Sequence, residues 1–208
     1  PTATVSAQVP AITVQPQPRT VIVGATTNFT VTATGQAPLR YQWRLNGVNI
    51  PRATNATYTI ANAQAIHSGV YSVLVANSNG AVLGARVTLS VQTPPTIVNH
   101  PQDRLVPPGE TAIFTVTAQG SSPLRYQWRY NGANMDGETN AILTISNVQT
   151  NKEGQYSVQV LNLYGTTNSQ PATLTVRSVP IIAVQPQSTN EFTGSSVSFH
   201  VTAFVTAP

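Results

Sequence analysis

The chain has 208 residues, with ten basic and six acidic side chains, a net charge of +4 and no cysteine. Without thiols it cannot form a disulfide framework, a cysteine nucleophile or a cysteine-based zinc site. So small a net charge argues against nucleic acid as a partner, because nucleic-acid footprints cluster basic residues more densely. No apolar run approaches the ~18 residues that a membrane span needs.

An 85-residue repeat organises the chain. Residues 10–94 align with residues 95–179 without a gap, and 41 of the 85 aligned positions are identical. Residues 180–208 correspond to the first strands of a third copy, and residues 1–9 resemble the last strand of a preceding one. We therefore expect two complete domains between two partial ones, as part of a longer array. The alternative is that strands from another molecule complete the open half.

Each copy contains a series of short segments in which apolar and polar residues alternate, the pattern of β-strands. The strand around Phe29 places Phe29, Val31 and Ala33 on one side and threonines on the other, and the next strand alternates Leu39, Tyr41, Trp43 and Leu45 with polar residues. Asn46-Gly47 is a hairpin turn signal. The predicted strands of the first copy cover residues 28–35, 39–45, 57–64, 70–77 and 86–92. This pattern is typical of an all-β sandwich.

Prolines mark the links between copies. Pro94, Pro95 and Pro180 lie where one copy ends and the next begins. Proline restricts its own backbone and that of the preceding residue, so we expect extended, stiff links. The predicted fold class is therefore a rod-like array of tandem β-sandwiches.

An aromatic pair recurs in both copies. Trp43 and Trp128 lie within the second predicted strand, and Tyr71 and Tyr156 each lie two residues before a valine. The set resembles the immunoglobulin-like sandwich, close to its I-set branch, and more narrowly the cysteine-free tandem versions in large bacterial secreted or surface proteins. In that family a core tryptophan, a tyrosine corner and two core cysteines occupy these positions, and valines replace the cysteines here. The core that the resemblance implies is Val31, Trp43, Tyr71, Val73, Val116, Trp128, Tyr156 and Val158.

The tyrosine corner departs from the family in one respect. The family usually has an aspartate four residues before the tyrosine, whereas this sequence has His67 in one copy and Lys152 in the other. The buried salt bridge that this aspartate makes in the family is therefore not expected here.

Residues suited to catalysis or metal binding do not converge. His67, His100 and His200 stand at positions that hold other residues in the other copies. Asp136 and Glu138 form the only close acidic pair, in a loop that we interpret as solvated. We expect no catalytic site, no metal site and no cofactor.

One polar face recurs. Arg40, Gln42 and Arg44 alternate with the core residues of their strand and are predicted to point outward, as are Arg125, Gln127 and Arg129 in the second copy. The planar donors of such side chains suit carboxylates, sulfates or sugar hydroxyls. The alternative interpretation is that the long arginine side chains only cover apolar parts of a solvated strand.

The resemblance implies a non-enzymatic function. We expect a structural or adhesive array in a bacterial extracellular or cell-surface protein, serving as a stalk, adhesin or fibre. Its partners would be other copies of the chain, neighbouring immunoglobulin-like units or a surface polysaccharide. The alternative is a set of spacer or carbohydrate-binding modules in a large secreted hydrolase.

Overall fold

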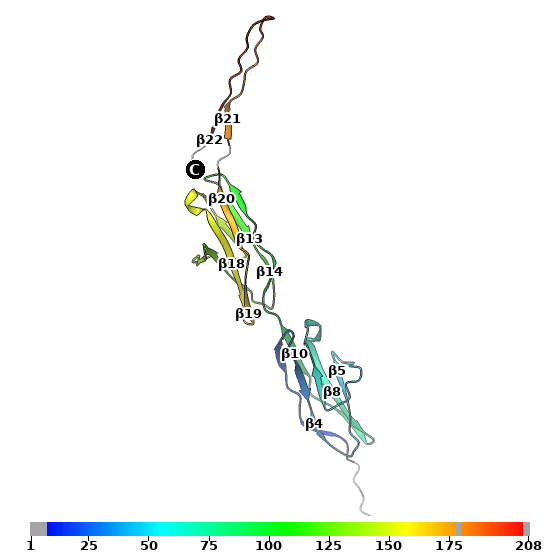
Figure 1. The fold of residues 1–208 in the computed structure, drawn as a ribbon. Helices are drawn as coiled ribbons and strands as arrows, with labels where there is room; N and C mark the ends of the chain where they lie inside the picture. The colour runs from blue at the N-terminus through cyan, green and yellow to red at the C-terminus, as the bar shows by residue number, and fades with distance from the viewer. Residues whose placement is uncertain (1–7, 178–179, 206–208) are drawn as a thin grey trace, which may run out of the picture. The chain divides into compact units, whose positions relative to one another are not determined.

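The computed structural model describes residues 8–177 and 180–205. It confirms the all-β prediction and divides the chain into two compact units, Pro1–Pro94 and Pro95–Pro208 (Figure 1). The preceding strand expected in residues 1–9 falls almost entirely on residues 1–7, which lie outside the described residues.

The first unit is a two-layer β-sandwich. One layer runs in the order β2-β10-β8-β5-β6, with β9 paired to β8, and the other consists of the pairs β3-β7 and β1-β4. Strand β2 pairs with β10 in parallel, while the other pairs are antiparallel. Its elements are β1 (Ala11–Val14), β2 (Arg19–Ile22), β3 (Thr27–Thr30), β4 (Thr32–Thr34), β5 (Arg40–Leu45), β6 (Val48–Asn49), β7 (Thr57–Ile60), the 3-10 turn η1 (Ala65–His67), β8 (Gly69–Asn77), β9 (Gly80–Leu83) and β10 (Val87–Gln92).

The second unit repeats this topology. Its first layer runs β12-β20-β18-β15-β16 with β19 on β18, and its second layer consists of β13-β17 and β11-β14. Its elements are β11 (Thr96–Asn99), β12 (Arg104–Val106), β13 (Ala112–Thr115), β14 (Thr117–Gln119), β15 (Arg125–Tyr130), β16 (Ala133–Asn134), β17 (Ile142–Ile145), the 3-10 turn η2 (Thr150–Lys152), β18 (Gly154–Asn162), β19 (Gly165–Asn168) and β20 (Ala172–Val176).

Two predicted strands differ from the observed ones. The strand expected over residues 28–35 is split into β3 and β4, because β3 pairs with β7 whereas β4 pairs with β1. Between them, the Val31 N–H donates to the Ala56 carbonyl at 3.0 Å. The strand expected over residues 57–64 ends at Ile60, since Asn62 adopts a left-handed φ of 53° that ends the extended run.

The Asn-Gly turns form as expected. Asn46 and Gly47 have φ values of 50° and 85°, and Asn131 and Gly132 have 46° and 85°. Positive φ at both central residues is the type I′ geometry, which matches the twist of paired strands. The turns join β5 to β6 and β15 to β16, and so fix where the arginine-bearing strands end.

Each unit contains its own aromatic core. Trp43 is 0% and Tyr71 1% exposed in the first unit, and Phe29 stacks on Tyr71 with ring centroids 4.7 Å apart. In the second unit Phe114 stacks on Tyr156 at 5.0 Å. The other residues of the core set, Val31, Val73, Val116, Trp128 and Val158, are also buried. Val31 and Val73 belong to one buried cluster, and Val116 and Val158 belong to the other, so the positions of the family's cysteines contribute apolar burial instead.

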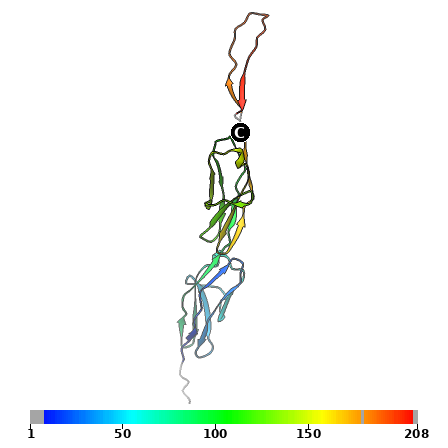
Figure 2. The ribbon, with the colours of Figure 1, turned by 90° about the vertical axis from the view of Figure 1, so that its left-hand side faces the viewer.

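The third copy is present as a hairpin. Strands β21 (Pro180–Val184) and β22 (Thr202–Val205) pair with the same register shift as β1 and β4, and form the orange-to-red segment of Figure 2. Phe199 and Val201 are 65% and 58% exposed, whereas the equivalent Phe29 and Val31 are 1% and 2% exposed. The difference arises because, within the described residues, no second layer covers the hairpin.

Candidate ligand-binding face

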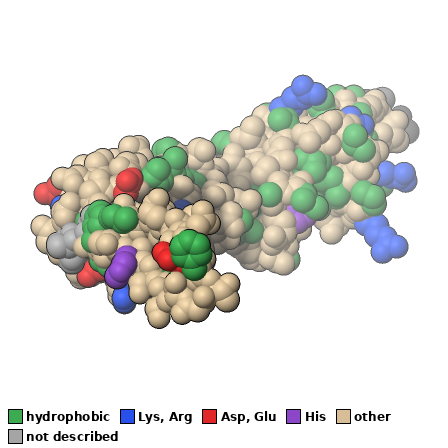
Figure 3. Space-filling model, turned by 90° about the horizontal axis from the view of Figure 1, so that it is seen from above, with side chains coloured by type: hydrophobic (Ala, Val, Ile, Leu, Met, Phe, Trp, Pro, Cys, Tyr) green, Lys and Arg blue, Asp and Glu red, His purple; other side chains and the backbone are tan. Residues whose placement is uncertain are grey.

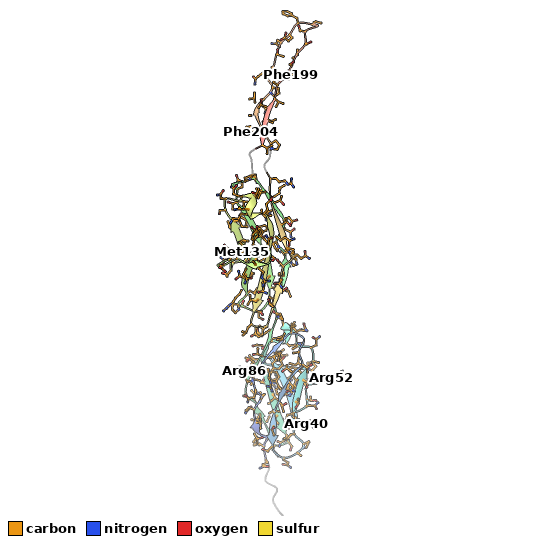
Figure 4. The ribbon with its side chains drawn as sticks, turned by 60° about the vertical axis from the view of Figure 1, so that its left-hand side comes forward. Arg40, Arg52, Arg86, Met135, Phe199 and Phe204 are labelled. Atoms are coloured by element: carbon orange, nitrogen blue, oxygen red, sulfur yellow. The ribbon has the colours of Figure 1, made fainter. Side chains whose placement is uncertain are left out.

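The six residues of the candidate face lie on β5 and β15. Both strands are central in their layers, between β8 and β6 or between β18 and β16. Arg40 and Arg125 are exposed at the start of each strand, and Arg44 and Arg129 are half-buried near the end. Figure 4 labels Arg40 in the first unit.

The glutamines between the arginines bond within their own unit. The Gln42 Nε2 donates to the carbonyls of Trp43 and Ile50 at 2.9 and 2.8 Å. The Gln127 Nε2 donates to Trp128 and Met135 at 3.0 and 2.7 Å. These bonds use both amide hydrogens, so the glutamines hold the β5-β6 and β15-β16 hairpins and have no donor left for a ligand.

The second arginine of each strand is held in a fixed orientation. The Arg44 Nε donates to Asn49 Oδ1 at 2.9 Å, and the Arg129 Nε donates to Asn134 Oδ1 at 3.0 Å. The terminal guanidinium nitrogens make no hydrogen bond within the described residues. A guanidinium oriented by its Nε loses less conformational entropy when it binds an anion.

The first arginine of each strand borders a hollow. In the first unit the hollow is about 440 Å³ and is lined by Pro38, Arg40, Ala76, Asn77 and Ser78. In the second unit it is about 350 Å³, and the lining residues are the equivalents Pro123, Arg125, Leu161, Asn162 and Leu163. Neither Arg40 nor Arg125 makes a hydrogen bond or ion pair with any described residue. The fold therefore places a free guanidinium beside the same hollow twice.

An asparagine fixes the shape of each hollow. The Asn77 Nδ2 donates to the carbonyls of Gln8 and Gln36 at 2.8 and 3.0 Å, and its Oδ1 accepts from the Asn79 and Gly80 N–H groups. Asn162 bonds Ser121 O and Tyr164 N in the same way. The sequence analysis missed this pair, although the identical Asn-x-x-Gly spacing in both copies is a usable signal.

Two of the three histidines accept backbone hydrogen bonds. His67 Nδ1 accepts from the Gln64 N–H at 2.8 Å, and His100 Nδ1 accepts from the Gln170 N–H at 3.1 Å. Among the described residues, no group of three histidine, aspartate or glutamate side chains could hold a metal ion. The same residues include no helix of the length and apolarity that crossing a membrane requires.

The tyrosine corners form without an aspartate. Tyr71 and Tyr156 donate their hydroxyls to the carbonyls of His67 and Lys152, each at 2.8 Å. Burial raises the pKa of both tyrosines to about 12, and the neighbouring Tyr58 or Tyr130 adds to the effect. Because each tyrosine hydroxyl binds a backbone carbonyl, this hydrogen bond does not depend on which side chain residue 67 or residue 152 carries.

The raised pKa values predict a loss of stability in alkali. Unfolded tyrosines release their proton near pH 10 and the folded pair only near 12, so the free energy of unfolding should be unaffected below about pH 10 and fall above it. The expected fall is up to about 1.4 kcal/mol per pH unit for each tyrosine, measured from urea midpoints at about pH 8 to 11.5. Tyr71→Phe with Tyr156→Phe should flatten this dependence, and an equally steep fall in that variant would contradict the assignment.

Curated relatives are animal proteins. The chain is 29% identical over 204 residues to the human "Peroxidasin homolog", covering 90% of the chain and 14% of that protein. It is 29% identical over 193 residues to human "Hemicentin-1", covering 85% and 3%. It is 27% identical over 218 residues to the mouse "Basement membrane-specific heparan sulfate proteoglycan core protein", covering 96% and 6%. The chain thus spans a small part of each relative, and these relatives do not support the bacterial source expected from the sequence.

Solved structures share the fold. An "I-band fragment I67-I69 from titin" has a TM-score of 0.64 at 20% identity, covering 94% of this chain and 76% of that chain. "Dpr11 IG1 bound to DIP-gamma IG+IG2" has a TM-score of 0.63 at 17% identity, covering 80% and 98%. The family model of the immunoglobulin domain matches residues 9–77, in the first unit, and residues 94–162, which lie in the second unit except for Pro94. The chain therefore belongs to the immunoglobulin domain family and contains that domain twice.

Proposed function

We propose that the chain is a non-enzymatic adhesive segment of an extracellular or cell-surface protein, and that it binds another immunoglobulin-like unit. Its domains would be residues 10–94 and 95–179, arranged in tandem along the chain. The mouse relative is named for basement membranes, and the Dpr11 structure is titled as a complex between immunoglobulin domains. Both printed descriptions are compatible with adhesion through such units.

The observation that carries the proposal is the repeated hollow. Arg40 and Arg125 border equivalent hollows, and neither guanidinium bonds to a described residue. Folding alone does not require an unbonded arginine at this position, because the core is complete beneath it. A partner carboxylate can accept two parallel hydrogen bonds from such a guanidinium. Asp136, exposed after β16 in the second unit, is such a carboxylate on a second copy of the chain.

The hollow of the second unit also offers apolar contact. Leu163 is 88% exposed at the turn between β18 and β19, and Leu161 lines the same hollow. The equivalent residues in the first unit, Ser78 and Ala76, are smaller. An exposed leucine beside an arginine suits a protein partner, since the apolar side chain contributes burial and the guanidinium contributes orientation.

Clustering of beads that carry the chain tests this function. We expect wild-type beads to cluster and beads carrying Arg40→Ser with Arg125→Ser to cluster several-fold more slowly. Arg19→Ser with Arg104→Ser is the matched control, because it removes the same charge from the equivalent strands β2 and β12 and should leave clustering unchanged. Equal clustering by both double variants would contradict a role for the hollows. Absence of clustering by the wild type would contradict self-adhesion.

A further inference from the structure

The charges of the chain are segregated by unit. Residues 1–94 contain five arginines and no acidic residue, whereas residues 95–179 contain five basic and five acidic residues. Figure 3 colours carboxylate side chains red and lysine and arginine side chains blue. The basic residues of the first unit are Arg19, Arg40, Arg44, Arg52 and Arg86. The charge of the chain is thus carried by one domain, and no carboxylate within that domain neutralises it.

Two of these arginines flank a buried serine. Arg44 on β5 is the direct cross-strand partner of Ser72 on β8. On the other side of β8, Arg86 immediately precedes Val87, which pairs with Tyr71, the neighbour of Ser72. Neighbouring strands lie about 4.8 Å apart, so the two arginines lie on either side of the serine on one face of the sheet.

A hollow lies at this point. It is about 220 Å³ and is lined by Asn46, Gly47, Val70, Ser72 and Arg86. Ser72 is 5% exposed, and its hydroxyl makes no hydrogen bond within the described residues. Arg86 is exposed and also makes no hydrogen bond or ion pair there (Figure 4). No buried side-chain oxygen or nitrogen of the described residues lacks a hydrogen-bond partner, so the unbonded Ser72 hydroxyl opens into the hollow. A hydroxyl that opens there beside the Arg86 guanidinium suits a polar ligand.

The second unit lacks this arrangement. Its equivalents of Arg86 and Val70 are Pro171 and Gln155, and the equivalent of Ser72 is the half-buried Ser157. The backbone around both positions is the same, since Ser157 pairs with Arg129 as Ser72 pairs with Arg44. The second unit can therefore be compared with the first, because it has the same fold but lacks the arginine pair.

We propose that the first unit binds an acidic polysaccharide, with a sulfate or carboxylate group held between Arg44 and Arg86 and a sugar hydroxyl at Ser72. Planar guanidinium donors suit both anions. An acidic protein fits this hollow less well, because Val70 is the one apolar side chain in its lining, whereas the hollow beside Arg125 also has two leucines. In the described part of the first unit, Phe29, Trp43 and Tyr71 are buried, and the exposed large apolar side chains are aliphatic.

Binding of the whole chain to dextran sulfate tests this proposal. We expect Arg44→Ser with Arg86→Ser to weaken binding by about tenfold or more, the effect of losing two charge-assisted contacts. Arg129→Ser with Arg177→Ser removes the same charge from the second unit and should change the affinity less than about twofold. Binding should weaken as salt rises, and uncharged dextran should not bind.

Three outcomes would overturn the proposal. Equal losses in the two double variants would mean that net charge alone drives the binding. No measurable binding of wild type at low salt would exclude a polyanion site. Displacement of dextran sulfate by polyglutamate at equal charge concentration would assign the face to acidic proteins. Because these variants leave both Arg40 and Arg125 in place, failure here is distinguishable from failure of the adhesion proposal. Unchanged thermal unfolding of each variant would verify that only the surface has changed.

Discussion

Trp128→Ala should unfold the second unit at urea concentrations where the first unit stays folded. Trp128 is 0% exposed, contacts Phe114 at a ring-centroid distance of 6.2 Å, and donates its indole N–H to the Asn140 carbonyl at 2.8 Å. Truncating a buried tryptophan typically costs about 3–5 kcal/mol, a large part of the ~5–15 kcal/mol that stabilises a domain. No disulfide is present to limit the damage.

The chain contains a built-in probe for this experiment. Trp43 is the only tryptophan left in the variant, so fluorescence reports the first unit, while far-UV circular dichroism reports both. We expect the Trp43 transition at the wild-type midpoint and a separate transition at lower urea by circular dichroism. Trp43→Ala should give the mirror result. A single shared transition in either variant would contradict separate cores.

Gly154→Ala should also strongly destabilise the second unit. Gly154 has a φ of 151°, and an added Cβ would lie 2.6 Å from Asn131 Oδ1 and 2.7 Å from Tyr130 Cε2. Neither neighbour can retreat easily, because Asn131 Oδ1 accepts the Gln155 N–H and the Tyr130 hydroxyl donates to the Glu153 carbonyl. We expect a loss of about 2–4 kcal/mol in the free energy of unfolding.

Gly132→Ala is the matched control for this glycine. Its φ is 85°, but no atom lies within 4 Å of an added Cβ. The expected loss in the free energy of unfolding is therefore only the ~1–2 kcal/mol that an alanine costs in the left-handed conformation. Comparison of the urea midpoints of Gly154→Ala and Gly132→Ala separates the cost of steric overlap from the cost of backbone strain. A larger loss in Gly132→Ala than in Gly154→Ala would show that the close contacts at Gly154 are not what requires glycine there.

Much of the fold could be predicted from the residues. The alternation around Trp43 and the Tyr-x-Val motif follow from the two-residue period of a β-strand. The Asn-Gly turn follows from the positive φ values that a two-residue hairpin loop requires. The split between β3 and β4 could not be predicted in this way. It depends on which strand each half pairs with, and pairing is a property of the whole sandwich.

The candidate site was less accessible to sequence reasoning. Alternation placed Gln42 on the outward side with Arg40 and Arg44, but its amide bonds to the Ile50 carbonyl, which only the hairpin brings near. The hollow that Asn46 and Arg86 both line joins residues 40 positions apart in sequence. Their proximity follows from the register of β8 with its neighbours. The segregation of charge between the units, by contrast, can be read from the sequence once the repeat is aligned.

Hydrogen exchange of the whole chain at low and high concentration tests the central claim, that the repeated arginine hollows are the recognition surface. The account predicts slower exchange at high concentration in the peptides around Arg40 and Arg125 and in those around Asn77 and Asn162. Arg40→Ser with Arg125→Ser should abolish that difference. Protection confined to β3, β7, β13 and β17, or to the exposed apolar hairpin of β21 and β22, would contradict the claim and place self-association elsewhere.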